Sequence, residues 1–71
     1  MADVMKLKKA INTLEPYVTD KDDFTYQCQH DKIYIGGGGV RVDNMTDDDV
    51  DQLDKLGFWW DSKFECWISF T

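Results

Sequence analysis

The chain has 71 residues, with 14 acidic against eight basic side chains and a formal net charge of −6. A single domain spanning residues 1–71 is expected, because this length supports only one small hydrophobic core. The excess of acid argues against nucleic acid and anionic membranes as partners, since both are bound through Lys and Arg. The charge favours a protein partner with a basic surface.

Motif searches predict neither a cofactor nor a metal site. There is no CxxC pair, and His30 is the only histidine, so zinc-ligand spacing is missing. Cys28 and Cys66 each fall on an apolar register and are expected to be buried, reduced thiols, although a disulfide between neighbouring strands stays open. The first residues lack a signal-peptide pattern and no long apolar run follows, which predicts a cytoplasmic protein.

Residues 3–14 are predicted to form an amphipathic helix. Val4, Leu7, Ile11 and Leu14 recur at spacings of three, four and three, which places them on one helical face. Pro16 disfavours helical backbone at the residue before it, so the helix is expected to end near residue 14 or 15.

A change to period two predicts two strands, residues 24–29 and 32–35, joined at His30 and Asp31. Residues 36–39 are four glycines that end the second strand. A flexible connector is the expected role of this run, with a loop that orders against a partner as the alternative. Residues 40–42 are expected to form a further short strand or an extended connector.

A second helix is predicted from Thr46, an N-cap, to Gly57, a left-handed stop. Val50, Leu53 and Leu56 form its buried stripe. Asp47, Asp48 and Asp49 suit the positive end of the helix, and the run from Asp47 to Asp51 lacks the spacing of a calcium loop. The alternative to this helix-start role is an acidic surface for a partner's Arg or Lys. Its candidate residues are Asp47, Asp48 and Asp51, with Asp43 and Asp54 as further contributors.

The last 16 residues contain all three tryptophans and are predicted to form a β-hairpin. A three-residue loop at residues 61–63 would place Trp60 opposite Phe64 and turn Trp59 and Trp67 outward, on the same side as Tyr34. Trp and Tyr are frequent in interface hot spots, so Trp59, Trp67 and Tyr34 are candidate partner-binding residues. Alternatively, one tryptophan wraps the sheet edge or packs under Val40 and Val42.

These elements predict an α+β fold: a small antiparallel sheet of four strands, or five if residues 40–42 pair, with two helices packed on one face, in the order α-β-β-(β)-α-β-β. Catalysis is not predicted. His30 lies at a turn, and no Ser or Cys occupies a recognisable nucleophile elbow.

The segment from Thr46 to Asp61, followed by residues 65–70, resembles small uncharacterised accessory proteins of tailed bacteriophages and prophages. These proteins have an acidic helix, a Leu-Gly-aromatic-x-Trp-Asp turn and a closing Trp-x-x-Phe strand. The resemblance covers roughly residues 43–71 and carries over no functional residue. It implies a short, acidic, virus-encoded protein that acts on a host component in the host cytoplasm.

The function expected from the sequence is non-enzymatic binding of a host protein, as an inhibitor or modulator, through the acidic surface or as a nucleic-acid mimic. The first alternative is a structural homodimer that associates through the outer aromatic face of the C-terminal hairpin. A base-stacking surface and a small phosphorylated ligand at residues 36–41 are weaker alternatives.

Overall fold

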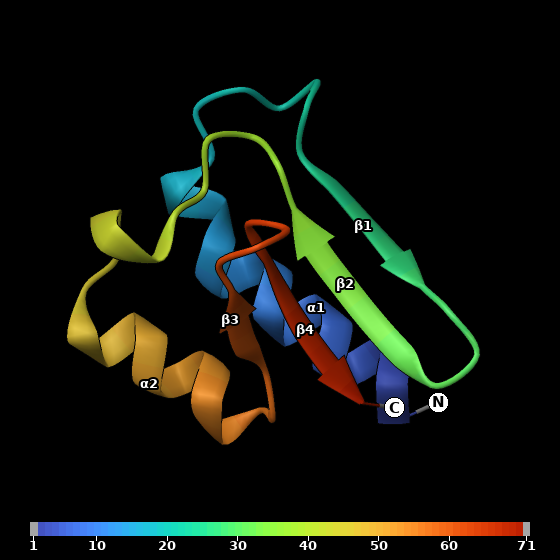
Figure 1. Ribbon diagram of the computed structural model, residues 1–71. Coiled ribbons are helices and arrows are strands. Elements are labelled where there is room, and N and C mark those ends of the chain that lie inside the picture. The colour runs from blue at the N-terminus through green and yellow to red at the C-terminus, as the bar shows by residue number, and fades with distance from the viewer. Residues whose placement is uncertain (1, 71) are drawn as a thin grey trace.

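The protein is an antiparallel sheet with both helices on one face, as Figure 1 shows for the computed structural model, which describes residues 2–70 and the side chains from residue 4 onward. Helix α1 is Ala2–Leu14 and helix α2 is Asp47–Lys55. The strands are β1 Thr25–Cys28, β2 Lys32–Gly36, β3 Trp59–Asp61 and β4 Cys66–Phe70. Short 3-10 turns follow α1 and precede α2, at Glu15–Tyr17 and Val42–Asn44. The expected α+β class is thus confirmed.

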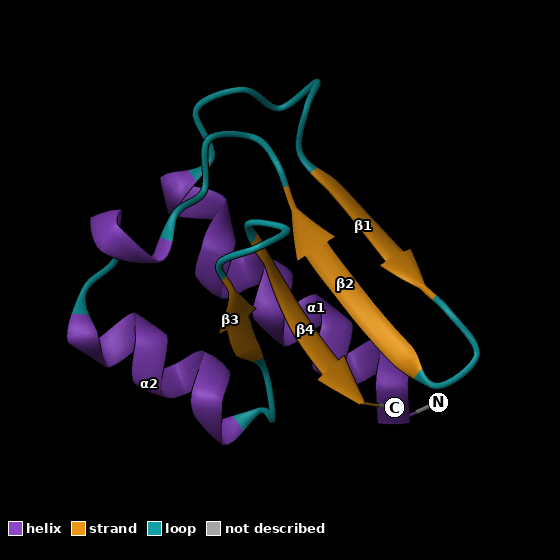
Figure 2. Cartoon of the chain, viewed as in Figure 1, coloured by secondary structure: helices purple, strands orange, loops and turns teal. Residues whose placement is uncertain are grey.

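The four strands are ordered β1-β2-β4-β3, and every neighbouring pair is antiparallel. Two hairpins, β1–β2 and β3–β4, are joined through their second strands (Figure 2). The fifth strand left open at residues 40–42 does not form, because Val40 turns inward to the core and Val42 starts a 3-10 turn. Strands β1 and β3 are therefore the two edges of the sheet.

The hydrophobic core lies between the sheet and the helices. It contains Ile33 and Ile35 from β2, Trp67 from β4, Phe58 before β3, and Leu14 and Leu53 from the two helices. Burial of Leu53, with Val50 and Leu56 packed against the core, confirms the predicted stripe of the second helix. In α1 the stripe is centred on Ala10, whereas Val4 is 52% exposed. Strand β1 is also exposed along its whole length, so it is less buried than its alternating sequence predicted.

The glycine run is ordered by close contact with residues 19–24, so the expectation of a flexible connector is wrong. Gly38 accepts hydrogen bonds from the backbone N–H groups of Thr19 and Asp20, at 2.8 and 3.1 Å. Gly37 has a φ of 76°, and a Cβ built on it would lie 2.2 Å from the Asp23 carbonyl oxygen. Glycine is required there because both the backbone conformation and the lack of space exclude a side chain.

The C-terminal hairpin has a different register from the one predicted. Trp60 pairs with Trp67 and Asp61 with Cys66, which leaves a four-residue loop at residues 62–65. Asp61 Oδ1 accepts hydrogen bonds from the backbone N–H groups of Lys63 and Phe64, at 2.9 and 3.0 Å, and closes this loop. The pairing differs from the expected Trp60–Phe64 pair by three residues, and an odd shift exchanges the two faces of a strand.

As a result, Trp67 turns inward and is only 2% exposed, so its expected outward position is wrong. The side chains that face away from the helices include Phe70 instead, which is 57% exposed. Trp67 occupies the alternative position that was predicted for one tryptophan, under Val40 and Val42. It shares the core with Val40 and borders Val42 in a cleft.

Candidate functional site

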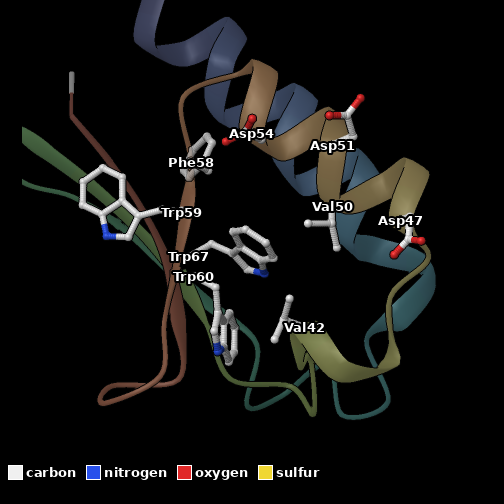
Figure 3. A pocket seen from close by; sticks show the side chains of 9 residues that line it. All are labelled: Val42, Asp47, Val50, Asp51, Asp54, Phe58, Trp59, Trp60 and Trp67. Carbon is white, nitrogen blue, oxygen red and sulfur yellow. The ribbon is translucent and has the colours of Figure 1, made fainter.

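A cleft of about 360 Å³ lies between α2 and the edge strand β3 (Figure 3). Apolar side chains form its walls and carboxylates from α2 form its rim. The lining residues are Val42, Asp47, Val50, Asp51, Asp54, Phe58, Trp59, Trp60 and Trp67. Pockets for small ligands and peptide anchors begin at about this volume. The cleft thus combines space, apolar contact area and negative charge.

Helix α2 places its carboxylates along the rim. Asp47, Asp51 and Asp54 follow one another at spacings of four and three residues, so they share one helical face. Asp49 faces a different direction, because its carboxylate accepts a hydrogen bond from the Tyr17 hydroxyl. Asp48 is exposed and does not line the cleft.

The charge on the rim has little compensation. Among the lining residues there are three carboxylates and no basic side chain. Lys55 Nζ lies 3.2 Å from Asp51 Oδ2, but both side chains are largely exposed. An exposed pair of this kind contributes little, because water and salt screen it. The rim is therefore a local concentration of negative charge above an apolar cavity.

Trp60 and Trp67 form the opposite wall and the floor. They are directly paired across β3 and β4, and their rings meet edge to face with centroids 5.5 Å apart. Trp59 borders the cleft through its place in β3, but Figure 3 shows its indole pointing away from the other lining side chains. That indole packs on Phe70, with ring centroids 5.2 Å apart, and is 40% exposed.

The indole nitrogen of Trp67 is buried and has no hydrogen-bond partner among the residues that the structure describes. In Figure 3 this nitrogen lies on the side of the ring toward Val42, inside the arc of lining residues. A buried donor without an acceptor costs about 1–3 kcal/mol. Trp67 therefore contributes to the cleft an unused N–H group that its neighbours cover, and an acceptor that reached it would satisfy it.

A second apolar surface lies on the sheet face that the helices leave open. Phe64, in the β3–β4 loop, is 68% exposed, and Phe70 and Trp59 lie on the same face. Tyr34 is on this face as expected, since it pairs with Ile68, and it is partly buried. Lys32 and Lys63 place their ammonium groups 5.6 Å from the ring centroids of Phe70 and Phe64. Tyr34 and the acidic rim therefore lie on different surfaces.

The structure brings together four of the six predicted site residues. Asp47, Asp51, Trp59 and Trp67 all line the cleft, whereas Tyr34 and Asp48 do not. The lining residues not predicted as a site are Val42, Val50, Phe58 and Trp60, whereas Asp54 was predicted only as a further contributor to the acidic surface. The spacing of Asp54 from Asp51 and Asp47 was a usable signal, whereas Val42 and Phe58 were visible only as candidate core residues.

Potential metal ligands do not cluster in the described residues. Over the part of the chain that the structure describes, no cluster of three or more His, Cys, Asp or Glu side chains could hold a metal ion. His30 is exposed at the β1–β2 turn. The thiols of Cys28 and Cys66 are free, the first exposed and the second buried. Cys28 thus departs from the expectation that both thiols are buried.

No family model, curated protein or solved structure matches the chain. The resemblance of residues 43–71 to phage accessory proteins therefore stays a prediction. Within residues 2–70, neither helix has the length and apolar character needed to cross a membrane.

Proposed function

We propose that this protein binds a partner protein through the cleft between α2 and β3, and that the partner presents basic side chains there. The observation that carries the proposal is the row formed by Asp47, Asp51 and Asp54 above an apolar cavity, with no basic residue in the lining. Opposite charge would speed the encounter, and burial of the apolar walls would supply affinity.

Binding, rather than catalysis, agrees best with the residues available. Among the described residues that line the cleft there are three carboxylates, but no Ser, Cys, His or Lys that could act with them as a nucleophile or a proton-transfer partner. A nucleic-acid ligand would be repelled by the same carboxylates. In keeping with the phage resemblance, the proposal includes a host protein as partner, inhibited or modulated in the cytoplasm, where Cys28 and Cys66 would stay reduced.

The test compares two triple variants of equal charge. Asp47→Asn, Asp51→Asn and Asp54→Asn remove the acidic rim, whereas Glu15→Gln, Asp22→Asn and Asp31→Asn remove three exposed charges elsewhere. Each is used to capture partners from a host lysate at low and high salt. Wild type and the control triple should recover the same salt-sensitive partner, and the rim triple should lose it. Equal recovery by both triples would contradict the proposal.

A homodimer is the second candidate, and the exposed aromatic side chains of the open sheet face favour it. Phe64 and Phe70 would meet their counterparts across a two-fold axis. Phe64→Ser with Phe70→Ser should then convert a dimer into a monomer in light scattering. The control is Val4→Ser with Met5→Ser, which removes two exposed apolar side chains from α1. A wild-type monomer at high micromolar concentration excludes this candidate.

A further inference from the structure

The cleft contains an unpaired indole N–H group as well as negative charge. Within the described part of the chain, Trp67 Nε1 is a buried donor without an acceptor, and Trp67 lines the cavity that carries the acidic rim. A free cation would satisfy the carboxylates but not the indole, because ammonium and guanidinium groups have no acceptor. An occupant that supplies a cation at the rim and an acceptor at the floor would satisfy both groups. A peptide segment has both, through its basic side chains and its backbone carbonyls.

Strand β3 supplies a place for such a segment. It is an edge strand, paired on one side only with β4, and α2 lies on its other side (Figure 1). No backbone group of Trp59, Trp60 or Asp61 hydrogen-bonds to another element of the described chain outside the sheet. A free strand edge is a template for an added strand, and alternate side chains of that strand then give specificity.

The spacing of the rim selects the sequence of the segment. Asp47 and Asp51 are four residues apart on a helix, which corresponds to about 6 Å along its axis. In an extended chain, residues i and i+2 point to the same side and lie about 7 Å apart. Two basic residues separated by one residue therefore match this pair of carboxylates, whereas adjacent basic residues point to opposite sides.

Arginine fits the cleft better than lysine. A guanidinium group is planar, can stack on the face of an indole such as the partly exposed Trp60, and can donate two parallel hydrogen bonds to a carboxylate. In Figure 3 the indole nitrogen of Trp67 lies on the side of its ring that faces Trp60 and the half-buried Val42. An acceptor from the segment would enter between these two side chains.

We infer that the cleft binds an extended Arg-x-Arg segment of the partner beside β3, with the arginines on the carboxylates of α2 and a backbone carbonyl on Trp67 Nε1. This inference rests on the proposed function, and it gives that function a defined partner chemistry. It assigns the unpaired indole N–H a role in recognition.

The test uses capped pentapeptides of identical composition and charge. One has the order Ala-Arg-Ala-Arg-Ala and the other Ala-Arg-Arg-Ala-Ala, and a third replaces both arginines of the first by the neutral isostere citrulline. Titration followed by tryptophan fluorescence should give saturable binding of the first peptide and binding about tenfold weaker for the second. Citrulline should abolish saturable binding. Equal affinity of the two arginine isomers, or no binding of the first, would overturn the inference.

A second measurement follows Trp67 directly. The indole N–H signals of the three tryptophans are resolved by ¹⁵N NMR and assigned with Trp67→Phe, or by elimination with Trp59→Phe and Trp60→Phe if Trp67→Phe does not fold. The Trp67 signal should move downfield on addition of Ala-Arg-Ala-Arg-Ala, because its proton gains an acceptor. An unchanged Trp67 signal at saturation would contradict the assigned hydrogen bond.

The two experiments fail in different ways. If the acidic-rim triple variant still captures the partner, the proposed function is wrong. If capture depends on the rim but the arginine isomers bind equally, the function stands and the extended Arg-x-Arg arrangement is wrong.

Discussion

The hydroxyl of Tyr17 donates a hydrogen bond to the carboxylate of Asp49, joining the turn after α1 to the first turn of α2. The same hydroxyl accepts from the backbone N–H of Thr46 at 3.3 Å. Thr46 Oγ1 in turn caps the helix by accepting from Asp49 N–H, also at 3.3 Å. These hydrogen bonds thus fix the start of α2 against the turn that follows α1. Because α2 carries the acidic rim, this contact positions the candidate site.

We predict that Tyr17→Phe lowers the free energy of unfolding by about 1–2 kcal/mol, since it removes a partly buried hydrogen bond to a charged group. The measurement is urea unfolding followed by circular dichroism. Tyr26→Phe is the matched control, because Tyr26 is largely exposed, and it should change stability by less than about 0.5 kcal/mol. Equal effects of the two variants would contradict a structural role for the Tyr17 hydroxyl.

The sequence predicted the local elements well because their signals are local. Thr46 and Gly57 bound α2 as expected, and the α1 helix ends before Pro16, followed by a 3-10 turn. Ile33 and Ile35 were predicted to share a face and are both buried. Each of these outcomes depends on a side chain and on backbone groups a few residues away.

The hairpin register could not be predicted in the same way. Either set of alternate side chains in β4 could face the core. One set is apolar and consists of Cys66, Ile68 and Phe70. The other combines the large Trp67 with the small Ser69. Packing against the helices decides between the two faces. The Trp67 indole fills the space toward α2, and Ser69 is fully buried next to Gly57, where a Cβ built on the glycine would lie 3.4 Å from the serine hydroxyl oxygen. Trp67 was predicted as a candidate partner-binding residue on the outer face of the sheet. It lines the cleft instead, from the inner face of β4.

The loop that sets this register contains a strained residue. Glu65 adopts a φ of 52°, a left-handed conformation that is unfavourable for a residue with a Cβ. We predict that Glu65→Gly stabilises the protein by about 0.5 kcal/mol in thermal unfolding. The relief of strain, about 1 kcal/mol, exceeds the loss of the exposed Arg41–Glu65 ion pair at 3.0 Å. Glu65→Gln keeps the strain and loses only the pair, so it should not stabilise.

The glycine run gives a prediction with an internal control. Gly37→Ala should lower stability by about 2 kcal/mol or more, because it combines a positive φ with a Cβ that meets a backbone oxygen at 2.2 Å. Gly57→Ala also has a positive φ, but its Cβ meets the flexible end of Lys6 at 3.1 Å. We expect Gly57→Ala to cost about 1 kcal/mol. Equal costs would mean that the contact with Asp23 contributes nothing.

Stability should also depend on alkaline pH through Cys66. Burial, with a smaller contribution from the nearby Asp61 carboxylate, raises the pKa of the Cys66 thiol. A raised folded-state pKa stabilises the protein fully below the unfolded value, about 8.5, and this contribution is lost as pH rises through the folded pKa. Urea unfolding at pH 7 and pH 10 should therefore show a larger loss for wild type than for Cys66→Ser. The exposed-site control Cys28→Ser should keep the wild-type loss.

The acidic rim provides a prediction that separates stability from binding. Asp54 lies in the last turn of α2, where the partial negative charge of the helix end disfavours a carboxylate, whereas Asp47 lies at the positive end. Asp54→Asn should therefore stabilise the free protein by about 0.3–0.5 kcal/mol, and Asp47→Asn should destabilise it by a similar amount. Both variants should weaken capture of the partner, because both carboxylates line the cleft. If capture followed stability, and Asp54→Asn bound better than wild type, the rim would be an electrostatic feature of the helix and the cleft would not be the binding site.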